Sequence, residues 1–476
     1  MSKIFWIINK YVGSEKSEEF YPYFLSNVQK ELEKNRNKLS FVFFSDRLSN
    51  NEDLRNKFVF RDQDFNYLTK ENLDIEAVRI ENDYEFTFKQ AYFADIIQVF
   101  EGRSDRVISV PEKYYSDLSF LVKRFLFLEE LLSSQECDVV FMDMSPEVEM
   151  EFARVIGLKL NKIVLKSYEG SALGGTVLMQ LFDFGKDHWV VTKGDTSWTK
   201  NDIKNFCKDF IENRRLPYMP YSVEAPKIGW VRRFWNALNE TSFFKFPLLL
   251  LRFFNGIIGE CFLIFEQEIL KKGIYDKFDP KIPNLFMGLH LGQESTMALR
   301  SQPFMNQIAL VEMISRVLPY NLVLYVREHP HWPRTFSYKY LKSVKKLSNV
   351  KLISPKISVH DILKNTTGVI TYNATTGIEA LLYNKPVLSF ASNIYSDHHS
   401  GVDKCLDLYD LGKKLSQLSN RKVSHEETIN YIYKLKNNNL SFGLGSYNFY
   451  SEKDSREKAI AFSLFLENSI INTINL

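Results

Sequence analysis

The chain has 476 residues, of which 45% are hydrophobic and 25% charged, with a net charge of +3 at pH 7. This length predicts at least two domains, and the small net charge argues against nucleic acid as the main partner. The four cysteines lie far apart without a C-x-x-C pair, so we expect reduced cytosolic thiols rather than a disulfide scaffold or a zinc ribbon.

In the first half of the chain, short apolar stretches alternate with helical patterns. Expected strands cover residues 3–8, 40–44, 138–142 and 162–165, and expected helices cover residues 20–35, 114–134 and 147–160. This alternation is typical of an α/β domain with a parallel sheet. The N-terminus has no small-residue cleavage site after its apolar run, so it predicts a buried strand rather than a signal peptide.

The pattern breaks in the middle of the chain and then resumes. Two proline-containing breaks, at 213–228 and 278–284, flank an aromatic, basic and helical stretch at 229–272. Beyond it, expected strands cover 285–291, 322–326, 368–372 and 387–390, and the stretch 343–354 holds the end of a helix followed by a further strand. Helices are expected at 303–317, 359–365 and 378–382, with a largely helical tail. The predicted fold is α/β, with two Rossmann-like domains and a helical insert. The predicted boundaries are 1–212, 213–280 (insert), 281–423 and 424–476 (tail).

One strand–loop–helix–strand unit, residues 371–390, carries a small-residue break at 373–377. In such units the loop after the first strand faces the ligand crevice, and the helix N-terminus favours anions. Thr376 and Glu379 also have the T-x-x-E spacing of a capping box. Two interpretations therefore stand: a helix cap alone, or a ligand site that also uses the cap.

Polar residues also follow other expected strands of this half. Arg327 and His329, with Pro330 ending the strand, are placed to neutralise a phosphate and to donate to a phosphate or sugar hydroxyl. Glu294 follows the expected strand that begins at residue 285 and is a candidate for binding a sugar hydroxyl. The plainer interpretation is a surface turn for Arg327 and His329, and a helix-capping loop for the segment that contains Glu294. The sequence places no third ligand beside His329 and His331, so no metal site is expected.

Carboxylates follow two expected strands of the N-terminal half. Asp143, with Glu147 and Glu149 after it, is a candidate general base or nucleophile, although Glu147 and Glu149 also suit the first turn of a helix. Glu169 is a second candidate catalytic carboxylate, in an expected glycine-containing loop at 167–175. The alternative for that loop is a flexible connection without a role in catalysis.

Three stretches of the second half together resemble a known family: GLHLGQEST, LYVREHP and NVKLISPKISVHDILKNTTGVITYNATTGIEALLYNKPVLSF. In order and spacing they are similar to the bacterial capsular polysaccharide biosynthesis family, whose better-known members are β-Kdo glycosyltransferases. The resemblance covers roughly residues 280 to 400 and is weak across 1–270. It implies a GT-B architecture, in which two Rossmann-like domains face a cleft and the C-terminal one holds a nucleotide-sugar.

The resemblance also implies a set of binding residues. His329 and Pro330 match the family's H-P motif, and Glu294 matches the Glu of its Q-P-E motif. The segment at 374–380 matches G-T-x-G-x-E-A, with Ala374 in place of the first Gly. The expected donor-binding residues are Glu294, Arg327, His329, Pro330, Asn373, Thr375, Thr376, Gly377 and Glu379. Gly292 and Gln293 stand where the family has Gln and Pro, so the donor sugar stays open, with a CMP-linked sugar among the candidates.

The function that the resemblance implies is transfer of a sugar from a nucleotide-sugar to a capsular polysaccharide or its lipid-linked acceptor. We expect a cytoplasmic enzyme without a further cofactor, whose aromatic and basic insert either contacts the inner membrane surface or packs against the two domains. The alternatives are a polyol-phosphate transferase of the teichoic-acid kind, a nucleotide-sugar 2-epimerase, and a catalytically silent GT-B module in a capsule assembly complex.

Overall fold

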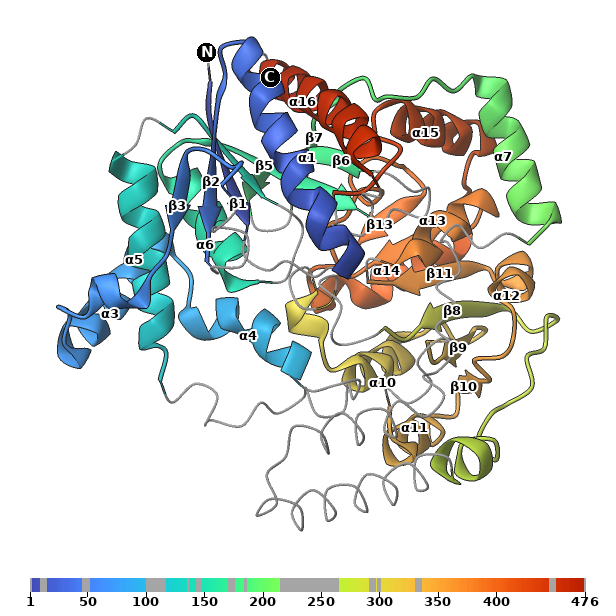
Figure 1. Cartoon of the computed structure of the whole chain (residues 1–476). Coiled ribbons are helices and arrows are strands. Elements are labelled where there is room, and N and C mark those ends of the chain that lie inside the picture. Colours follow the sequence, from blue (N-terminus) through green and yellow to red (C-terminus); the bar gives the residue numbers. More distant parts are fainter. Residues whose placement is uncertain are drawn as a thin grey trace, which may run out of the picture.

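The computed structural model describes residues 2–8, 15–44, 52–99, 117–134, 137–142, 147–169, 176–183, 186–214, 265–290, 297, 301–329, 336–372, 374–444 and 451–474. These residues form two α/β units, each built on its own sheet (Figure 1). The first sheet has seven strands in the order β3-β2-β1-β4-β5-β6-β7, and the second has six in the order β10-β9-β8-β11-β12-β13.

The N-terminal sheet is parallel from β3 to β5 and antiparallel from β5 to β7. Its strands are β1 (Lys3–Ile8), β2 (Lys38–Phe43), β3 (Lys57–Val59), β4 (Val139–Met142), β5 (Ile163–Glu169), β6 (Thr176–Asp183) and β7 (Lys186–Trp189). The sheet is covered on both faces. Along β1, Trp6 joins a core with helices α1 and α16, while Ile7 joins a core with helices α3 to α6. Because both faces of the sheet are buried, its parallel strands are continuous apolar stretches in the sequence.

The helices of the N-terminal unit are α1 (Glu15–Lys34), α3 (Lys70–Tyr84), α4 (Phe88–Val99), α5 (Ser119–Ser134) and α6 (Val148–Lys159), followed by α7 (Lys200–Glu212). Thr69 and Thr199 each accept a hydrogen bond from the backbone three residues later and so close capping boxes at α3 and α7. Short 3₁₀ turns lie at Asp62–Phe65, Gln302–Phe304 and Leu408–Asp410, and a π-helical turn at Glu266–Leu270.

The C-terminal sheet is parallel throughout. Its strands are β8 (Asn284–Gly288), β9 (Val323–Arg327), β10 (Val350–Ile353), β11 (Gly368–Thr371), β12 (Val387–Ser389) and β13 (Val402–Lys404). Its helices are α10 (Gln307–Val317), α11 (Tyr338–Val344), α12 (Val359–Asn365), α13 (Thr375–Leu382), α14 (Leu411–Asn420) and α15 (His425–Asn437). The chain adds β9 and β10 on one side of β8 and β11 to β13 on the other, so the strand order reverses between β8 and β11. Open parallel sheets bind ligands at that point.

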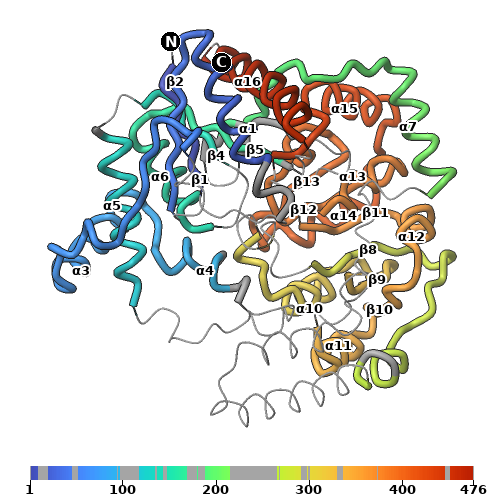
Figure 2. The backbone as a smooth tube through the Cα atoms, viewed as in Figure 1, coloured from blue at the N-terminus to red at the C-terminus, as the bar shows by residue number. Residues whose placement is uncertain are grey.

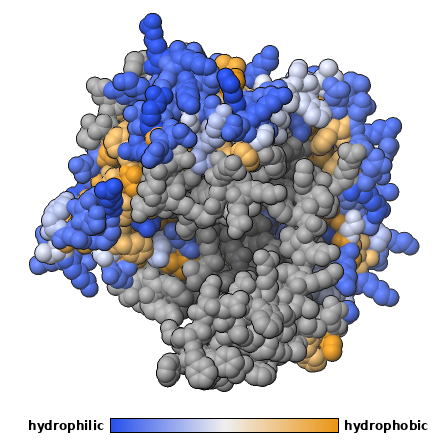
Figure 3. Space-filling view, in the orientation of Figure 1, coloured by the Kyte–Doolittle hydropathy of each residue, from blue (hydrophilic) through white to orange (hydrophobic). Residues whose placement is uncertain are grey.

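The last helix, α16 (Glu452–Ile474), returns to the N-terminal unit and lies along α1 (Figure 2). The Phe462 ring lies 5.3 Å from the Trp6 ring, in the core shared by α1 and α16. Glu467 accepts hydrogen bonds of 2.8 Å from Asn35 and from Asn37. The first and last described helices thus both stabilise the N-terminal unit. The surface over α1 and α16 is mostly hydrophilic (Figure 3).

The fold class predicted from the sequence is confirmed: the protein is α/β and GT-B-like, with two Rossmann-like sheets. Each strand predicted in the N-terminal half and in the resumed pattern has its counterpart. Several boundaries differ. The strand predicted at 285–291 ends at Gly288, and β5 continues to Glu169 and pairs with Thr176 of β6 rather than ending near Leu165. Strands β3, β6, β7 and β13 and helices α3, α4, α7 and α14 were not predicted.

Most of the predicted insert, residues 215–264, lies outside the described residues, and the domain boundaries stay predictions. Within the described residues no helix has the length and apolarity that a membrane span needs. Three of the four cysteines are free and buried, and Cys261 lies outside the described residues. Burial raises the pKa of the Cys137 thiol to about 12 and that of Cys207 to about 11, so both stay protonated and unreactive at neutral pH.

Candidate functional site

The candidate site lies at the carboxyl ends of β8, β9 and β11, where the strand order reverses. After β8, Gln307 at the start of α10 fixes the backbone of His290. The His290 N–H donates to Oε1 of Gln307 at 2.7 Å, and Nε2 of Gln307 donates to the His290 carbonyl at 2.9 Å. The His290 ring lies edge-on to the ring of Tyr372, which follows β11, with centroids 5.4 Å apart. The ends of β8 and β11 are therefore packed together.

His329 is the half-buried side chain at the end of β9, two residues beyond Arg327. The sheet order puts β9 and β11 on either side of β8, so His329 and the first turn of α13 belong to the same edge of the sheet. A histidine at a strand end beside a helix N-terminus is suited to binding a phosphate, because both the ring N–H and the helix dipole favour negative charge.

Arg327 faces the interior of the protein. Its side chain is 7% exposed, its Nη1 donates to the Ile357 carbonyl at 2.7 Å, and its guanidinium lies 5.5 Å from the centre of the Phe286 ring. Burial lowers its pKa to about 10, and the Glu379 charge partly opposes that shift. Arg327 thus holds the end of β9 from inside, and its charge lies under α13.

Glu379 occupies the underside of α13 and is 5% exposed. Burial raises its pKa to about 7, opposed by a hydrogen bond from Thr375 and by the charge of Arg327. The predicted capping box of Thr376 with Glu379 is wrong, because α13 begins at Thr375 and Ala374 is its N-cap, without a side-chain hydrogen bond. The carboxyl of Glu379 connects the first turn of α13 with the buried Arg327.

Gly377 is required by packing against Tyr395. A Cβ atom at Gly377 would lie 2.5 Å from both Cζ and the hydroxyl oxygen of the Tyr395 side chain. The Tyr395 hydroxyl donates to the Ala374 carbonyl at 2.8 Å and so fixes the residue that caps α13. The glycine in the T-T-G-x-E segment therefore lets Tyr395 support the helix start from below.

Glu328, between Arg327 and His329, forms a fully buried ion pair. Its Oε1 lies 2.8 Å from Nζ of Lys271, with both side chains 0% exposed, and its Oε2 accepts from the Tyr275 hydroxyl at 2.6 Å. Burial raises the pKa of Glu328, and Lys271 and Tyr275 oppose the shift. This ion pair fixes the residue next to His329 to the segment at 265–276. No sequence pattern indicates this ion pair, because its two partners lie 57 residues apart.

Two further residues near the site had not been singled out from the sequence. Asn393, after β12, is 0% exposed, donates to the Ser389 hydroxyl at 2.9 Å and accepts from the Ser396 N–H at 2.7 Å, which fixes the following loop. The Tyr372 hydroxyl is buried and has no hydrogen-bond partner among the described residues, and burial raises its pKa well above the ordinary value. The available signal was their place after a β-strand: Tyr372 directly follows β11, and Asn393 lies in the loop that follows β12.

The stretch Asp397-His398-His399, which follows β12, makes structural contacts through its first and last residues. Asp397 pairs with Lys404 at 2.5 Å. The Gly401 N–H donates to Nδ1 of His399 at 2.9 Å, and Nε2 of the same ring lies 3.2 Å from the Thr428 hydroxyl. Burial lowers the pKa of His399. In the described parts of the chain no group of three or more His, Cys, Asp or Glu side chains is arranged to hold a metal ion.

Several predicted site residues lie outside the described part of the chain: Asp143, Glu294, Pro330 and Asn373. Glu169 closes β5, and its side chain is outside the description. Glu149 is fully buried and forms an ion pair with Arg124 of α5, so its carboxylate ties α6 to α5. Glu147 is the N-cap residue of α6. The catalytic carboxylate stays a prediction.

Comparison with known proteins gives a family match in the C-terminal unit. Residues 302–452 match the family described as capsule polysaccharide biosynthesis protein. No curated protein matches the chain. The match runs from the turn before α10 to the first residue of α16 and includes Arg327, His329 and all of α13.

Solved structures give weaker likenesses. A β-Kdo 2,4 transferase, KpsC of Thermosulfurimonas dismutans, is 12% identical, with 63% of this chain and 88% of that chain covered and a TM-score of 0.32. The β-Kdo 2,7 transferase of the same organism's KpsC is 13% identical, with 67% and 97% covered and a TM-score of 0.30. A UDP-GlcNAc 2-epimerase from Methanocaldococcus jannaschii is 12% identical, with 91% and 99% covered and a TM-score of 0.26. TM-scores of this size do not establish a shared fold, so the fold assignment rests on the strand order.

The family match includes the ends of β9 and β11, two of the three strand ends that form the candidate site, while the end of β8 lies before the matched residues. The match confirms the resemblance stated from the sequence motifs, and residues 302–452 of this chain carry the sequence pattern of the capsule polysaccharide biosynthesis family.

Proposed function

We propose that the protein is a glycosyltransferase that moves a sugar from a nucleotide-sugar to a surface polysaccharide or its lipid-linked precursor. One observation supports this most: the capsule-family match covers strands β9 to β13 of the all-parallel C-terminal sheet, including the strand ends that carry His329 and lead to the start of α13. In parallel α/β sheets such strand ends are where ligands bind.

In this proposal His329 and the first turn of α13 bind the phosphates of the donor. His329 donates a hydrogen bond to a phosphate oxygen, and the helix dipole of α13 stabilises the negative charge that grows as the nucleotide leaves. Arg327 and Glu379 act as positioning residues. Their buried contacts with Ile357 and Thr375 hold the end of β9 and the start of α13 in fixed places.

The proposed reaction has a simple balance. A hydroxyl of the acceptor glycan attacks the anomeric carbon of the donor sugar, and the bond from that carbon to the phosphate oxygen breaks. The hydroxyl proton passes to a carboxylate of the N-terminal unit, for which Asp143 and Glu169 are the candidates. The nucleotide leaves with the bonding electron pair and remains an anion at the C-terminal strand ends.

A product analysis with the purified full chain tests this proposal. CMP-, UDP- and GDP-linked sugars and CDP-glycerol would each be supplied with an oligosaccharide acceptor, and nucleotide release and product mass would be measured. We expect nucleotide release with at least one nucleotide-sugar and a product heavier by one sugar without phosphorus. His329→Ala should lower the rate about 10²–10³-fold, as for other lost contacts to a developing oxyanion.

The matched control is His425→Ala, which removes an exposed histidine of the same unit and should leave the rate unchanged. Two outcomes would overturn the proposal. A product that contains phosphorus would instead establish polyol-phosphate transfer. An absence of nucleotide release and product with every donor would favour a module that binds without catalysis.

A further inference from the structure

The last helix, α16, is apolar on two opposite sides. Its inner side, which includes Phe462 and Leu466, packs in the core shared with α1. Its outer side carries four large aliphatic side chains that are between 46% and 65% exposed: Ile460, Leu464, Ile471 and Ile474. At 3.6 residues per turn these four positions fall within an arc of about 80°. They form one apolar line along the outside of the helix, which we call the outer stripe.

Charged residues cover the surface around the outer stripe. The first turns of α16 expose Lys453 and Glu457, and α1 beside it exposes Lys30 and Lys34. The surface over these two helices is mostly hydrophilic (Figure 3). The outer stripe therefore begins at Ile460, within α16, and is not a general property of this side of the protein. An apolar patch with a polar rim marks an interaction surface.

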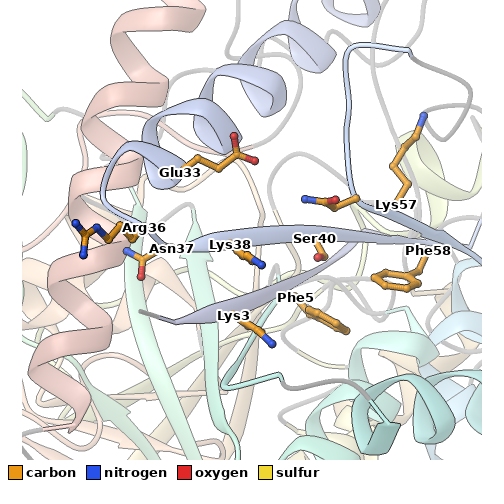
Figure 4. A pocket seen from close by; sticks show the side chains of 10 residues that line it. Lys3, Phe5, Glu33, Arg36, Asn37, Lys38, Ser40, Lys57 and Phe58 are labelled. Carbon is orange, nitrogen blue, oxygen red and sulfur yellow. The ribbon is translucent and has the colours of Figure 1, made fainter.

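No outward charge interrupts the outer stripe. Glu467 is the one charged residue in the sequence from 459 to 474, and its buried carboxylate accepts hydrogen bonds of 2.8 Å from Asn35 and from Asn37. The carboxylate is thus turned towards α1. Figure 4 shows Asn37 in the turn that lies next to α16. Because these hydrogen bonds and the shared core hold α16 in place, the outer stripe lies on a fixed helix.

The spacing of the outer stripe is nearly the same in both directions. Its gaps are four, seven and three residues along the chain, and three, seven and four residues against it. When two copies of α16 lie antiparallel across a two-fold axis near residue 467, Ile460 faces Ile474 of the second copy. Leu464 then faces Ile471 of the second copy, and each contact occurs twice, as an interface between identical surfaces requires. With position 467 included, the gaps alternate between four and three, the period of helices that pack side by side.

A second copy fits the outer stripe better than a membrane does. A helix docked on a bilayer carries an excess of Lys and Arg on its polar face. Residues 452–458 of α16 instead hold three acidic and three basic side chains and carry no net charge. Val191 extends the apolar patch, since its side chain is exposed and its carbonyl accepts from Asn472 of α16 at 2.8 Å. A contact of about 21 Å is short for an interface of about 800 Å² per partner, so we expect a dimer that dissociates on dilution.

We propose that the outer stripe joins two copies of this chain into a two-fold symmetric dimer, in which the two α16 helices are antiparallel. Each copy removes its four aliphatic side chains from water by packing them against those of the other. The outer stripe contains no residue of the candidate donor site, because α16 packs on the N-terminal unit. The dimer is therefore independent of the proposed transferase function, and the two are tested separately.

Sedimentation velocity of the full chain at increasing concentration tests the dimer. We expect a species of twice the chain mass whose share grows with concentration. Leu464→Glu and Ile471→Glu each bring a carboxylate into the contact and should raise the dissociation constant at least about tenfold. The matched control is Ile75→Glu, which changes an isoleucine of α3 that is 61% exposed and should leave the dissociation constant unchanged. Because all three side chains are exposed, the thermal unfolding midpoint of the monomer should stay the same in each variant.

Disulfide formation tests the antiparallel arrangement. The double variant Leu464→Cys/Ile471→Cys should form a covalent dimer on oxidation, because each thiol faces the other position of the second copy. Either single variant should not, since equal positions lie on opposite sides of the axis. Within one chain the two positions are about 10 Å apart along the helix, beyond the reach of a disulfide. The wild-type chain, oxidised in the same way, controls for the four native cysteines.

Three outcomes would overturn the proposal. One is a chain that stays monomeric at every concentration, and another is a dimer with wild-type affinity in both glutamate variants. Covalent dimers in the single cysteine variants, without a further gain in the double variant, would contradict the antiparallel contact. Co-sedimentation with phosphatidylcholine–phosphatidylglycerol vesicles covers the remaining occupant: a monomer that binds these vesicles and is released by Leu464→Glu would assign the outer stripe to a lipid surface instead.

Discussion

The two sheets use buried charge differently at the residues that follow their strands. In the C-terminal unit, Lys271 and Glu328 are both 0% exposed and hold the end of β9 from inside. In the N-terminal unit, Glu149 is 0% exposed, but its partner Arg124 is 27% exposed and lies near the rings of Phe60 and Phe120. The first pair is closed off from water, while the second reaches the surface.

The buried charges at the end of β9 show that polar residues after a strand do not all contact a ligand. Three consecutive residues, Arg327, Glu328 and His329, end or follow one strand. Arg327 and Glu328 are buried, whereas His329 is half-buried. The side chains of Arg327 and Glu328 hold the backbone at the end of β9 in place, so only the His329 side chain is left to contact a ligand. Polar residues at a strand end therefore divide into those that hold the site and those that meet the ligand.

The largest expected effect is on the buried ion pair. Lys271→Met leaves the Glu328 carboxylate buried without its cation, which should cost about 3–5 kcal/mol of unfolding free energy. Arg124→Met should cost clearly less, since the partly exposed site admits water to Glu149. Denaturant unfolding of both variants measures the difference. Equal losses would contradict the contrast between the two units.

The next largest expected effect is a change of the unfolding free energy with pH, caused by Glu379 of the C-terminal unit. The folded chain keeps a proton on Glu379 up to about pH 7, whereas the unfolded chain releases it near pH 4.5. Between these values the folded state binds more protons, so its stability falls as pH rises. The wild type should lose up to about 3 kcal/mol relative to Glu379→Gln between pH 4.5 and 8. Parallel pH profiles of the two proteins would show that Glu379 is not the group responsible.

A smaller effect is expected where α13 meets Tyr395. Gly377→Ala places a Cβ atom 2.5 Å from the Tyr395 ring and should cost about 1–3 kcal/mol through overpacking. Gly288→Ala is the matched control, because its Cβ meets nothing closer than 3.9 Å, at Phe286. Thermal or denaturant unfolding compares the two. If Gly377→Ala is as stable as Gly288→Ala, the start of α13 is less rigid than its contacts indicate.

The smallest effect concerns the Tyr372 hydroxyl, which is buried without a hydrogen-bond partner among the described residues. Tyr372→Phe removes this desolvated group and should raise the unfolding free energy by up to about 1 kcal/mol. Unfolding by denaturant without nucleotide measures it. A loss of stability in Tyr372→Phe would mean that the hydroxyl does have a partner in the folded chain.

The regular part of this fold could be predicted from the sequence, because buried parallel strands are short β-branched runs that a helix follows. The antiparallel strands β6 and β7 escaped prediction, since their pairing depends on a hairpin rather than on a local period. The candidate site residues stay predictions, but their contacts show what the sequence pattern can and cannot reveal. Position followed from the strand ends, whereas the partners of Glu328 and Gly377 are distant in sequence and become neighbours only in the folded chain.

The most direct test of a donor site at the end of β9 is a nucleotide titration of the wild type and His329→Ala, in which binding is measured as a rise in the thermal unfolding midpoint. A ligand that binds the native state must raise the midpoint by mass action. We expect the thermal midpoint to rise with one nucleotide among CMP, UDP and GDP. This rise should be lost in His329→Ala and kept in His425→Ala. A rise of the same size in His329→Ala, or none with any nucleotide, would contradict a donor site at the end of β9.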